Sequence, residues 1–167
     1  DFQRGVQSML VAMPAASLAG MRRGLRKFGP DNQTVVMFDE LMDSKTLFLT
    51  ANTTTVYNFG WLNTKDGPVV IEVPPKVLGT IDNFWFHWVG DIGVTGADKG
   101  KGGKYLFLPP GYDGKVPDGY LVYRPLTYSV NFAFRPVAKN GGTSEDQSAY
   151  VKTMKIYRLS EAAKPPK

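Results

Sequence analysis

Cysteine is absent from this chain of 167 residues, and histidine occurs once, at His87. Without cysteine the chain can form no disulfide, bind no metal through thiolates and use no cysteine nucleophile. A single histidine cannot build a multi-histidine metal centre, although it could join a carboxylate such as Asp82, Asp91 or Glu72. We therefore predict no metal site and no cofactor.

Common hydrolase motifs are also missing, since the sequence contains no Gly-x-Ser-x-Gly and no His-Glu-x-x-His. The stretch 96–104, GADKGKGGK, has the glycines and lysines of a phosphate-binding loop. It lacks the order Gly-Lys-Ser/Thr, and it leads into a predicted strand at 105–108 rather than into a helix. We interpret it as a connection between strands, with a shallow anion-binding nest as the alternative.

The charge is only mildly unbalanced, with a net charge of +5 and an isoelectric point near 9.4. Basic residues cluster at 22–27 and 99–104, and neither cluster is interleaved with aromatic residues as a nucleic-acid stacking surface would be. We expect no nucleic-acid partner. The apolar stretch 6–20 is too short and too interrupted to span a bilayer, and we interpret it as part of a buried helix.

Glycine and proline are abundant, at 18 and 12 residues, which favours many turns and short strands over long helices. One helix is predicted over about 1–28, because apolar residues recur there at helical spacing and Gly29-Pro30 follows. We expect its Met/Leu face to lie on a sheet while its arginines face water. A partner-binding amphipathic helix is the alternative.

From residue 33 onward apolar residues recur with a period of two, which indicates strands separated by turns rich in glycine, proline and aspartate. The alternating sets are Val35/Met37, Leu47/Leu49, Tyr57/Phe59/Trp61, Val69/Ile71/Val73, Phe84/Phe86/Trp88, Leu106/Leu108, Tyr120/Val122, Tyr128/Val130/Phe132/Phe134 and Met154/Ile156. This favours a mainly β protein, a β-sandwich or jelly roll of antiparallel sheets or else a barrel, with the N-terminal helical segment packed on one side. We assign 1–160 to a single β-rich domain and 161–167 to a flexible tail or linker remnant.

The aromatic stretch around the only histidine is the first candidate for chemistry. Alternation places Trp85 and His87 on one face of a strand and Phe84, Phe86 and Trp88 on the other. If the phenylalanine face lines the core, Trp85 and His87 look outward or into a second cavity. His87 could then transfer protons or contact a ligand, because histidine side chains in general change charge near neutral pH; a ring satisfied within the sheet is the alternative.

Two acidic residues flank this stretch, Asp82 and Asp91. Either could serve with His87 as an acid/base pair, which makes these three residues the candidates for catalysis. A serine-hydrolase mechanism would have to recruit Ser129 beside a lone histidine, and nothing else in the sequence favours it.

Polar residues at strand ends supply further ligand-binding candidates. Asn52 and Tyr57 belong to a polar entry into a strand, where they either form a turn or offer neutral donors and acceptors at a pocket rim. Arg124 ends a strand before Pro125 and could bind a carboxylate in two-pronged fashion. An internal salt bridge from Arg124 to Asp113 or Asp118 is an equal alternative.

Several ordered motifs between about residues 2 and 159 resemble the domain-of-unknown-function family 1254. They are Ala51-Asn52-x-x-Thr55-x-Tyr57, Asp66-Gly67-Pro68-Val69-Val70-Ile71-Glu72-Val73-Pro74, Gly90-Asp91-x-Gly93, Gly100-x-Gly102-Gly103-Lys104-Tyr105-Leu106, Pro109-Pro110-Gly111-Tyr112, Pro117-x-Gly119-Tyr120 and Val122-Tyr123-Arg124. The resemblance implies a bacterial, exported or periplasmic protein whose domain is usually followed by a second β-rich domain, family 1214, and it brings no known activity.

One position departs from the family pattern. Members commonly show Asn-x-Asp-Thr-x-Tyr, and Thr54 stands where the acid is expected. If that carboxylate does chemistry in relatives, this chain does not use it, which puts a catalytic role for the segment in doubt.

These observations lead to three hypotheses. The first is a β-sandwich module that binds a small anionic or aromatic molecule as part of a larger assembly, with the ligand contacted by Asn52, Tyr57, Trp85, His87 and Arg124. The second is a hydrolase-like enzyme using His87 with a nearby aspartate. The third is a purely structural interaction domain whose exposed aromatics are covered by a partner, either a second β-rich domain or chain or another copy in a homo-oligomer.

Overall fold

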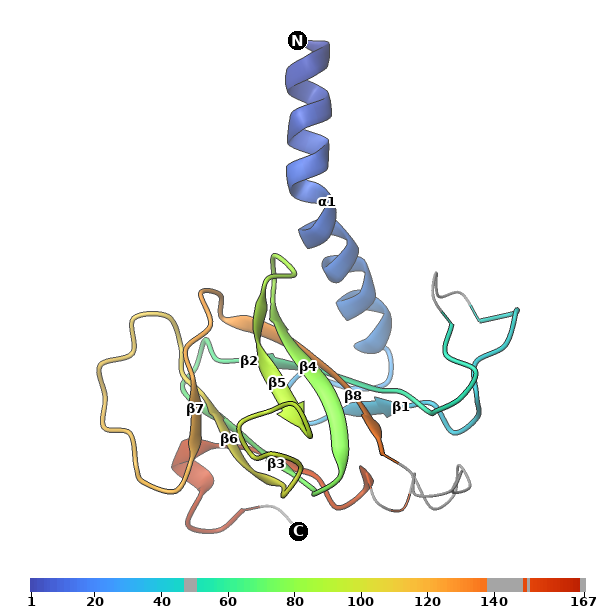
Figure 1. The fold of residues 1–167 in the computed structure, drawn as a ribbon. Coiled ribbons are helices and arrows are strands. Elements are labelled where there is room, and N and C mark those ends of the chain that lie inside the picture. Colours follow the sequence, from blue (N-terminus) through green and yellow to red (C-terminus); the bar gives the residue numbers. More distant parts are fainter. Residues whose placement is uncertain (47–50, 138–148, 150, 166–167) are drawn as a thin grey trace.

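The computed structural model describes residues 1–46, 51–137, 149 and 151–165. Among the elements bounded within these residues, one long helix, α1, precedes nine strands and a short 3-10 turn, and Figure 1 shows their arrangement. The elements are α1 (Phe2–Leu25), β1 (Val35–Met37), β2 (Asn58–Asn63), β3 (Val69–Val73), β4 (Val77–Asn83), β5 (Trp88–Gly93), β6 (Gly103–Phe107), β7 (Leu121–Tyr123), β8 (Ser129–Pro136), β9 (Lys155–Arg158) and η1 (Leu159–Glu161). The strand predicted around Leu47 and Leu49 lies outside the described residues.

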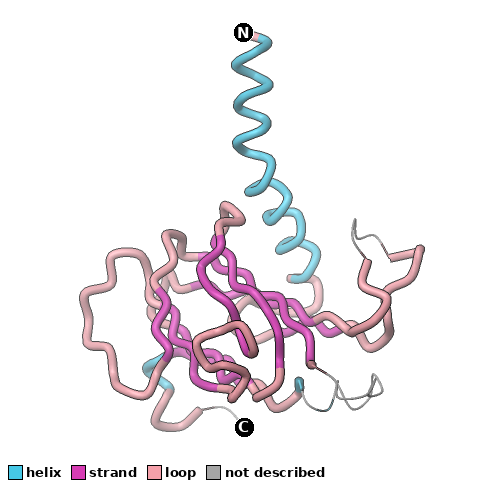
Figure 2. Tube along the Cα trace, in the orientation of Figure 1, coloured by secondary structure: helices cyan, strands magenta, loops and turns pink. Residues whose placement is uncertain are grey.

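The strands form two sheets, which confirms the prediction of a mainly β fold (Figure 2). The five-stranded sheet has the order β1-β2-β8-β4-β5 and is antiparallel throughout. The four-stranded sheet has the order β7-β6-β3-β9, and its β6–β7 pair is parallel. The sheets are therefore joined by long connections rather than built from hairpins alone.

The core lies between the two sheets, where every second side chain of the strands points inward. The two sheets contribute buried side chains that face one another across this core. They are Val69, Ile71, Tyr105 and Phe107 from the four-stranded sheet and Leu62, Ile81, Phe132 and Phe134 from the five-stranded sheet. Burying each such side chain contributes roughly 1.5–3 kcal/mol. A smaller apolar cluster, Val70, Leu106, Leu108 and Tyr157, lies on the outer side of the four-stranded sheet under Tyr112, Val116 and Tyr120. Ala162, in the predicted tail, also packs on this cluster.

Helix α1 contacts the domain only through its C-terminal part. Leu18 is its one buried residue, and its N-terminal half extends away from both sheets (Figure 1). The predicted helix therefore exists, but it ends at Leu25 rather than near residue 28, and its packing on the sheet is limited to the second half. Within the described part of the chain, no helix has both the length and the hydropathy needed to cross a bilayer.

The predicted strand at 84–88 is wrong, because a turn between β4 and β5 occupies most of it. The side chain of Asn83 fixes this turn: its Oδ1 accepts the backbone N–H groups of Trp85 at 2.8 Å and of His87 at 3.1 Å. Phe86 has a φ of 61°, outside the range of a strand. Phe84, Phe86 and Trp88 therefore do not share a core-facing surface.

The glycine-rich stretch connects two strands, β5 and β6, as predicted. Its backbone groups are largely used within the loop, since Gly100 N–H donates to Gly93 and Gly102 N–H donates to Asp98 Oδ2 at 2.8 Å. The buried Asp98 also accepts a hydrogen bond from Tyr105 Oη at 2.6 Å. Because these amides are engaged, the anion-nest alternative loses support.

Candidate functional site

A hollow of about 370 Å³ lies where the last turns of α1 approach the turn between β4 and β5. Three arginines, one aromatic ring and a small residue line it: Arg22, Arg23, Arg26, Phe84 and Ala19. We call it the arginine hollow. Its volume falls within the range of small-molecule sites, about 300–1,000 Å³.

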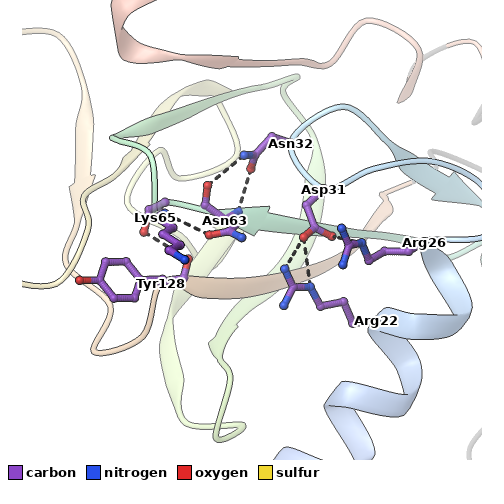
Figure 3. Close-up of polar contacts among 8 residues, drawn as sticks. Arg22, Arg26, Asp31, Asn32, Asn63, Lys65 and Tyr128 are labelled. Atoms are coloured by element: carbon purple, nitrogen blue, oxygen red, sulfur yellow. Dashed lines mark hydrogen bonds and ion pairs between the residues drawn. The ribbon is translucent and has the colours of Figure 1, made fainter.

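One carboxylate, Asp31, faces Arg22 and Arg26 from the loop after the helix (Figure 3). Arg22 donates to Asp31 Oδ2 through Nε at 3.1 Å and also through its terminal nitrogen. Arg26 Nε lies 3.7 Å from Asp31 Oδ1. The Asp31 side chain is only 7% exposed, so losing Arg22 would leave a buried charge unpaired, and this pairing fixes the position of Arg22.

Asp31 is itself held in place by the next residue. Asn32 hydrogen-bonds to the backbone of Asn63 and Trp61 in β2, and Figure 3 shows this link beside the arginines. The helix end, the loop and β2 therefore form one connected unit around the hollow. Such a connected unit keeps charged groups pre-positioned for a ligand.

Aromatic rings adjoin the guanidinium groups. The Arg22 guanidinium carbon lies 5.7 Å from the centre of the Trp61 ring, within cation–π range. The Trp61 and Phe84 ring centres are 5.9 Å apart. The hollow thus offers positive charge beside an apolar wall.

A row of polar and aromatic residues crosses the same outer face of the five-stranded sheet. Trp61 in β2 is paired with Asn131 in β8, Asn131 with Asp82 in β4, and Asp82 with Trp88 in β5. Trp61 Nε1 and Asn131 Oδ1 are buried and have no hydrogen-bond partner within the described part of the chain. Because an unsatisfied buried group costs about 1–3 kcal/mol, these atoms mark a place for a water molecule or a ligand atom.

The structure places the three predicted catalytic residues in different settings. Asp82 is buried in β4, burial raises its pKa, and the nearby charge of Asp91 raises that pKa further. Asp91 accepts a hydrogen bond from Trp88 Nε1 at 2.8 Å. His87 is exposed in the turn, and among the described residues its side chain forms no hydrogen bond or ion pair with either aspartate. Catalysis by these residues stays a prediction.

The other predicted ligand residues lie on separate segments. Asn52 Oδ1 accepts the backbone N–H groups of Thr54 at 2.8 Å and Thr55 at 2.9 Å, which is the turn foreseen as its structural role. Tyr57 stacks on Phe59 with ring centres 5.6 Å apart.

Arg124 follows β7, and its guanidinium donates to the backbone carbonyl of Tyr112 at 3.2 Å. In the described residues it forms no salt bridge with Asp113 or Asp118, so that alternative was wrong. Trp85 is exposed beside Phe84. The arginine hollow is lined by none of the five predicted ligand residues, which are Asn52, Tyr57, Trp85, His87 and Arg124. Their role in ligand binding stays a prediction.

A second hollow, of about 500 Å³, lies between the loop before β1 and strand β9. Its charged groups are partly engaged: Arg158 contacts Asp66 at 3.1 Å, and Glu161 accepts the Arg158 N–H at 3.1 Å. Its lining balances two cations, Lys155 and Arg158, against two carboxylates, Asp31 and Glu161, whereas the charged residues lining the arginine hollow are all arginines.

Sequence reasoning missed the arginine hollow because it assigned Arg22, Arg23 and Arg26 to a water-facing side of the helix. A signal was available, since Arg22 and Arg26 are four residues apart and thus share a helix face, and Asp31 follows the Gly29-Pro30 stop. Phe84 was assigned to a strand, on the face that would line the core if Trp85 and His87 looked outward. No local pattern indicates that its turn would lie against the helix.

The fold and this site define a two-sheet β-sandwich domain with an N-terminal helix whose basic end adjoins the outer sheet face. The chain belongs to the family described as "Protein of unknown function (DUF1254)", whose model matches residues 32–158. The crystal structure of the VPA0106 protein from Vibrio parahaemolyticus is similar, with a TM-score of 0.71 at 18% sequence identity. That similarity covers 95% of this chain and 39% of the VPA0106 chain.

Comparison with curated proteins finds no match. Within the described residues no group of three or more His, Cys, Asp or Glu side chains is arranged to hold a metal ion. The family and the solved relative therefore establish the fold, and function rests on the site.

Proposed function

We propose that this domain binds a small molecule carrying both an anionic group and an aromatic or apolar body, and that the arginine hollow is the binding site. The observation that carries the proposal is the excess of positive charge: three arginines line the hollow, and one carboxylate, Asp31, faces two of them, Arg22 and Arg26. Arg23 is exposed and forms no ion pair within the described residues, so its guanidinium is free for a ligand.

The aromatic neighbours give the ligand its second property. A carboxylate contacting Arg23 and Arg26 places the rest of the molecule near Phe84, and Trp61 extends this apolar wall. Basic residues in a last helical turn also offset the negative end of the helix dipole. That structural role requires neither the hollow nor the rings beside it.

Binding can be measured by isothermal titration calorimetry with benzoate, benzamide and acetate. Benzoate is expected to bind better than both, because it alone combines the carboxylate with the ring. Arg23→Gln should weaken benzoate binding about tenfold, equivalent to about 1.4 kcal/mol. Lys115→Gln removes the same charge from an exposed loop outside the hollow and should leave binding unchanged.

Two outcomes would contradict the proposal. One is equal binding of benzoate and benzamide, which would remove the anionic requirement. The other is an equal loss of benzoate affinity in Arg23→Gln and Lys115→Gln, which would show that the effect comes from the net charge of the protein and not from the hollow. The hydrolase-like and purely structural hypotheses stay predictions beside this one.

A further inference from the structure

The free half of α1 presents an unusual surface. No charged residue occurs between Arg4 and Arg22, and the apolar side chains of this stretch are exposed where the helix leaves the domain (Figure 1). Phe2, Val6, Met9 and Met13 are between 40% and 84% exposed. A single exposed apolar residue is ordinary, but a continuous set on a projecting helix indicates an interaction surface.

Six residues form one stripe along this helix: Phe2, Val6, Met9, Met13, Ala16 and Gly20. Their separations alternate between four and three residues, which is the spacing of a helix–helix seam. All six are exposed. We call them the outer stripe.

The outer stripe faces away from the domain. Leu18 marks the side of the helix that contacts the sheet, and successive residues are about 100° apart around the axis. Ala16 and Gly20 each lie two residues from Leu18, hence about 160° around the helix from it in either direction. A second helix can therefore lie along the stripe without contacting the sheets of the chain that carries the stripe.

The side chains of the outer stripe fit those of a second copy of the stripe in size when the two helices run antiparallel. When two copies of the stripe run in opposite directions, Phe2 meets Gly20, Val6 meets Ala16, and Met9 meets Met13. A large side chain thus faces a small one at both ends, which is how facing layers interdigitate. In a parallel pair Phe2 would face Phe2 and Gly20 would face Gly20, leaving crowding at one end and a gap at the other.

We infer that α1 pairs antiparallel with α1 of a second copy of this chain, through the outer stripe. The arrangement is isologous, because each residue meets its partner twice around a two-fold axis near Met9 and Met13. It places the two β domains at opposite ends of the helix pair and on opposite sides of it. The lack of charge between Arg4 and Arg22 leaves no like-charge repulsion along the seam.

The test uses sedimentation velocity of the 167-residue chain over a range of concentrations. The unaltered chain is expected to form a concentration-dependent dimer. Met9→Glu and Met13→Lys, each alone, should be monomeric because a charge faces a methionine twice in each pair. Val11→Glu is the matched control: Val11 is 70% exposed but lies about 20° around the helix from Leu18, on the side opposite the stripe, so this variant should still dimerise.

Mixing the two monomeric variants tests the direction of pairing. An antiparallel heterodimer brings the introduced glutamate of one chain against the introduced lysine of the other and leaves one Met–Met contact unaltered, so the mixture should dimerise. A parallel pair would gain no such contact. Circular dichroism of each variant confirms that the helix and sheets are retained.

The inference is overturned if the unaltered chain stays monomeric at every concentration, or if Met9→Glu dimerises as well as Val11→Glu does. Failure of the mixture to dimerise overturns the antiparallel arrangement. Co-sedimentation of a monomeric chain with phosphatidylcholine/phosphatidylglycerol vesicles would assign the stripe to a lipid surface instead. None of these outcomes depends on ligand binding in the arginine hollow.

Discussion

Asn32 and Asn63 form a reciprocal pair of hydrogen bonds between a side chain and a backbone. Asn32 Nδ2 donates to the Asn63 carbonyl at 2.9 Å, and Asn32 Oδ1 accepts the Asn63 N–H at 2.8 Å. Asn32 has a φ of 65°, in the left-handed region that asparagine tolerates better than most residues. One residue thus joins the loop carrying Asp31 to β2.

Replacing Asn32 should reveal both of its roles. Asn32→Ala is expected to destabilise the domain by about 3 kcal/mol, because it removes two hydrogen bonds and strains the backbone. Asn32→Gly removes the same bonds without the strain and should cost about 1 kcal/mol less. Urea unfolding of both variants measures the difference. Equal losses would show that the backbone conformation contributes nothing.

Gly60 in β2 should tolerate no side chain, because the Phe132 ring from β8 lies directly against it. A Cβ built on Gly60 would overlap the Phe132 ring. Gly60→Ala is therefore expected to destabilise the domain by about 1–3 kcal/mol, measured by chemical unfolding. Gly5→Ala is the control, since nothing lies near its Cβ and alanine favours helix; it should be neutral or stabilising by up to about 1 kcal/mol. A neutral Gly60→Ala would contradict this packing.

The buried carboxyl of Asp82 should make stability depend on pH. Its pKa is raised in the folded state by burial and by Asp91, so the folded state holds its proton more tightly than the unfolded state. This contribution to stability is complete below about pH 4 and is lost as the pH rises through the folded-state pKa. The stability of Asp82→Asn relative to the unaltered chain should therefore increase with pH over that window.

Urea unfolding at several pH values between about 4 and 7 measures this difference. Asp113→Asn, at an exposed position, serves as the matched control and should differ little from the unaltered chain across the same range. If the difference in unfolding free energy between Asp82→Asn and the unaltered chain stays constant with pH, the pKa of Asp82 is not raised by folding.

Strands whose two faces have distinct environments were predictable from alternation alone. β3 and β8 place their inward residues in the core at the predicted positions, among them Val69, Ile71, Phe132 and Phe134. β4 escaped prediction because Gly79 and Thr80 interrupt its apolar pattern. The turn at 84–87 was predicted as a strand because its aromatic residues alternate as they do in a strand. The hydrogen bonds that close the turn are accepted by the side chain of Asn83, and alternation carries no information about them.

The candidate site was less predictable than the fold because tertiary packing assembles it. Arg22 and Arg26 belong to a helix, Asp31 to a loop and Phe84 to a turn more than fifty positions further on. Each has an ordinary local explanation as a solvated charge, a turn former or a core aromatic. Only the approach of α1 to the outer face of the five-stranded sheet brings them together.

The central position of β8 constrains how the chain acquires its structure. β8 lies between β2 and β4, while β1 pairs only with β2, and β5 pairs with β4. A nascent chain that has not yet exposed residue 129 therefore holds two unconnected strand pairs of this sheet, β1–β2 and β4–β5. Pairings between such distant segments are slow to form, and the open strand edges are prone to aggregation until they close. This domain should consequently fold after its synthesis is nearly complete and depend on protection until then.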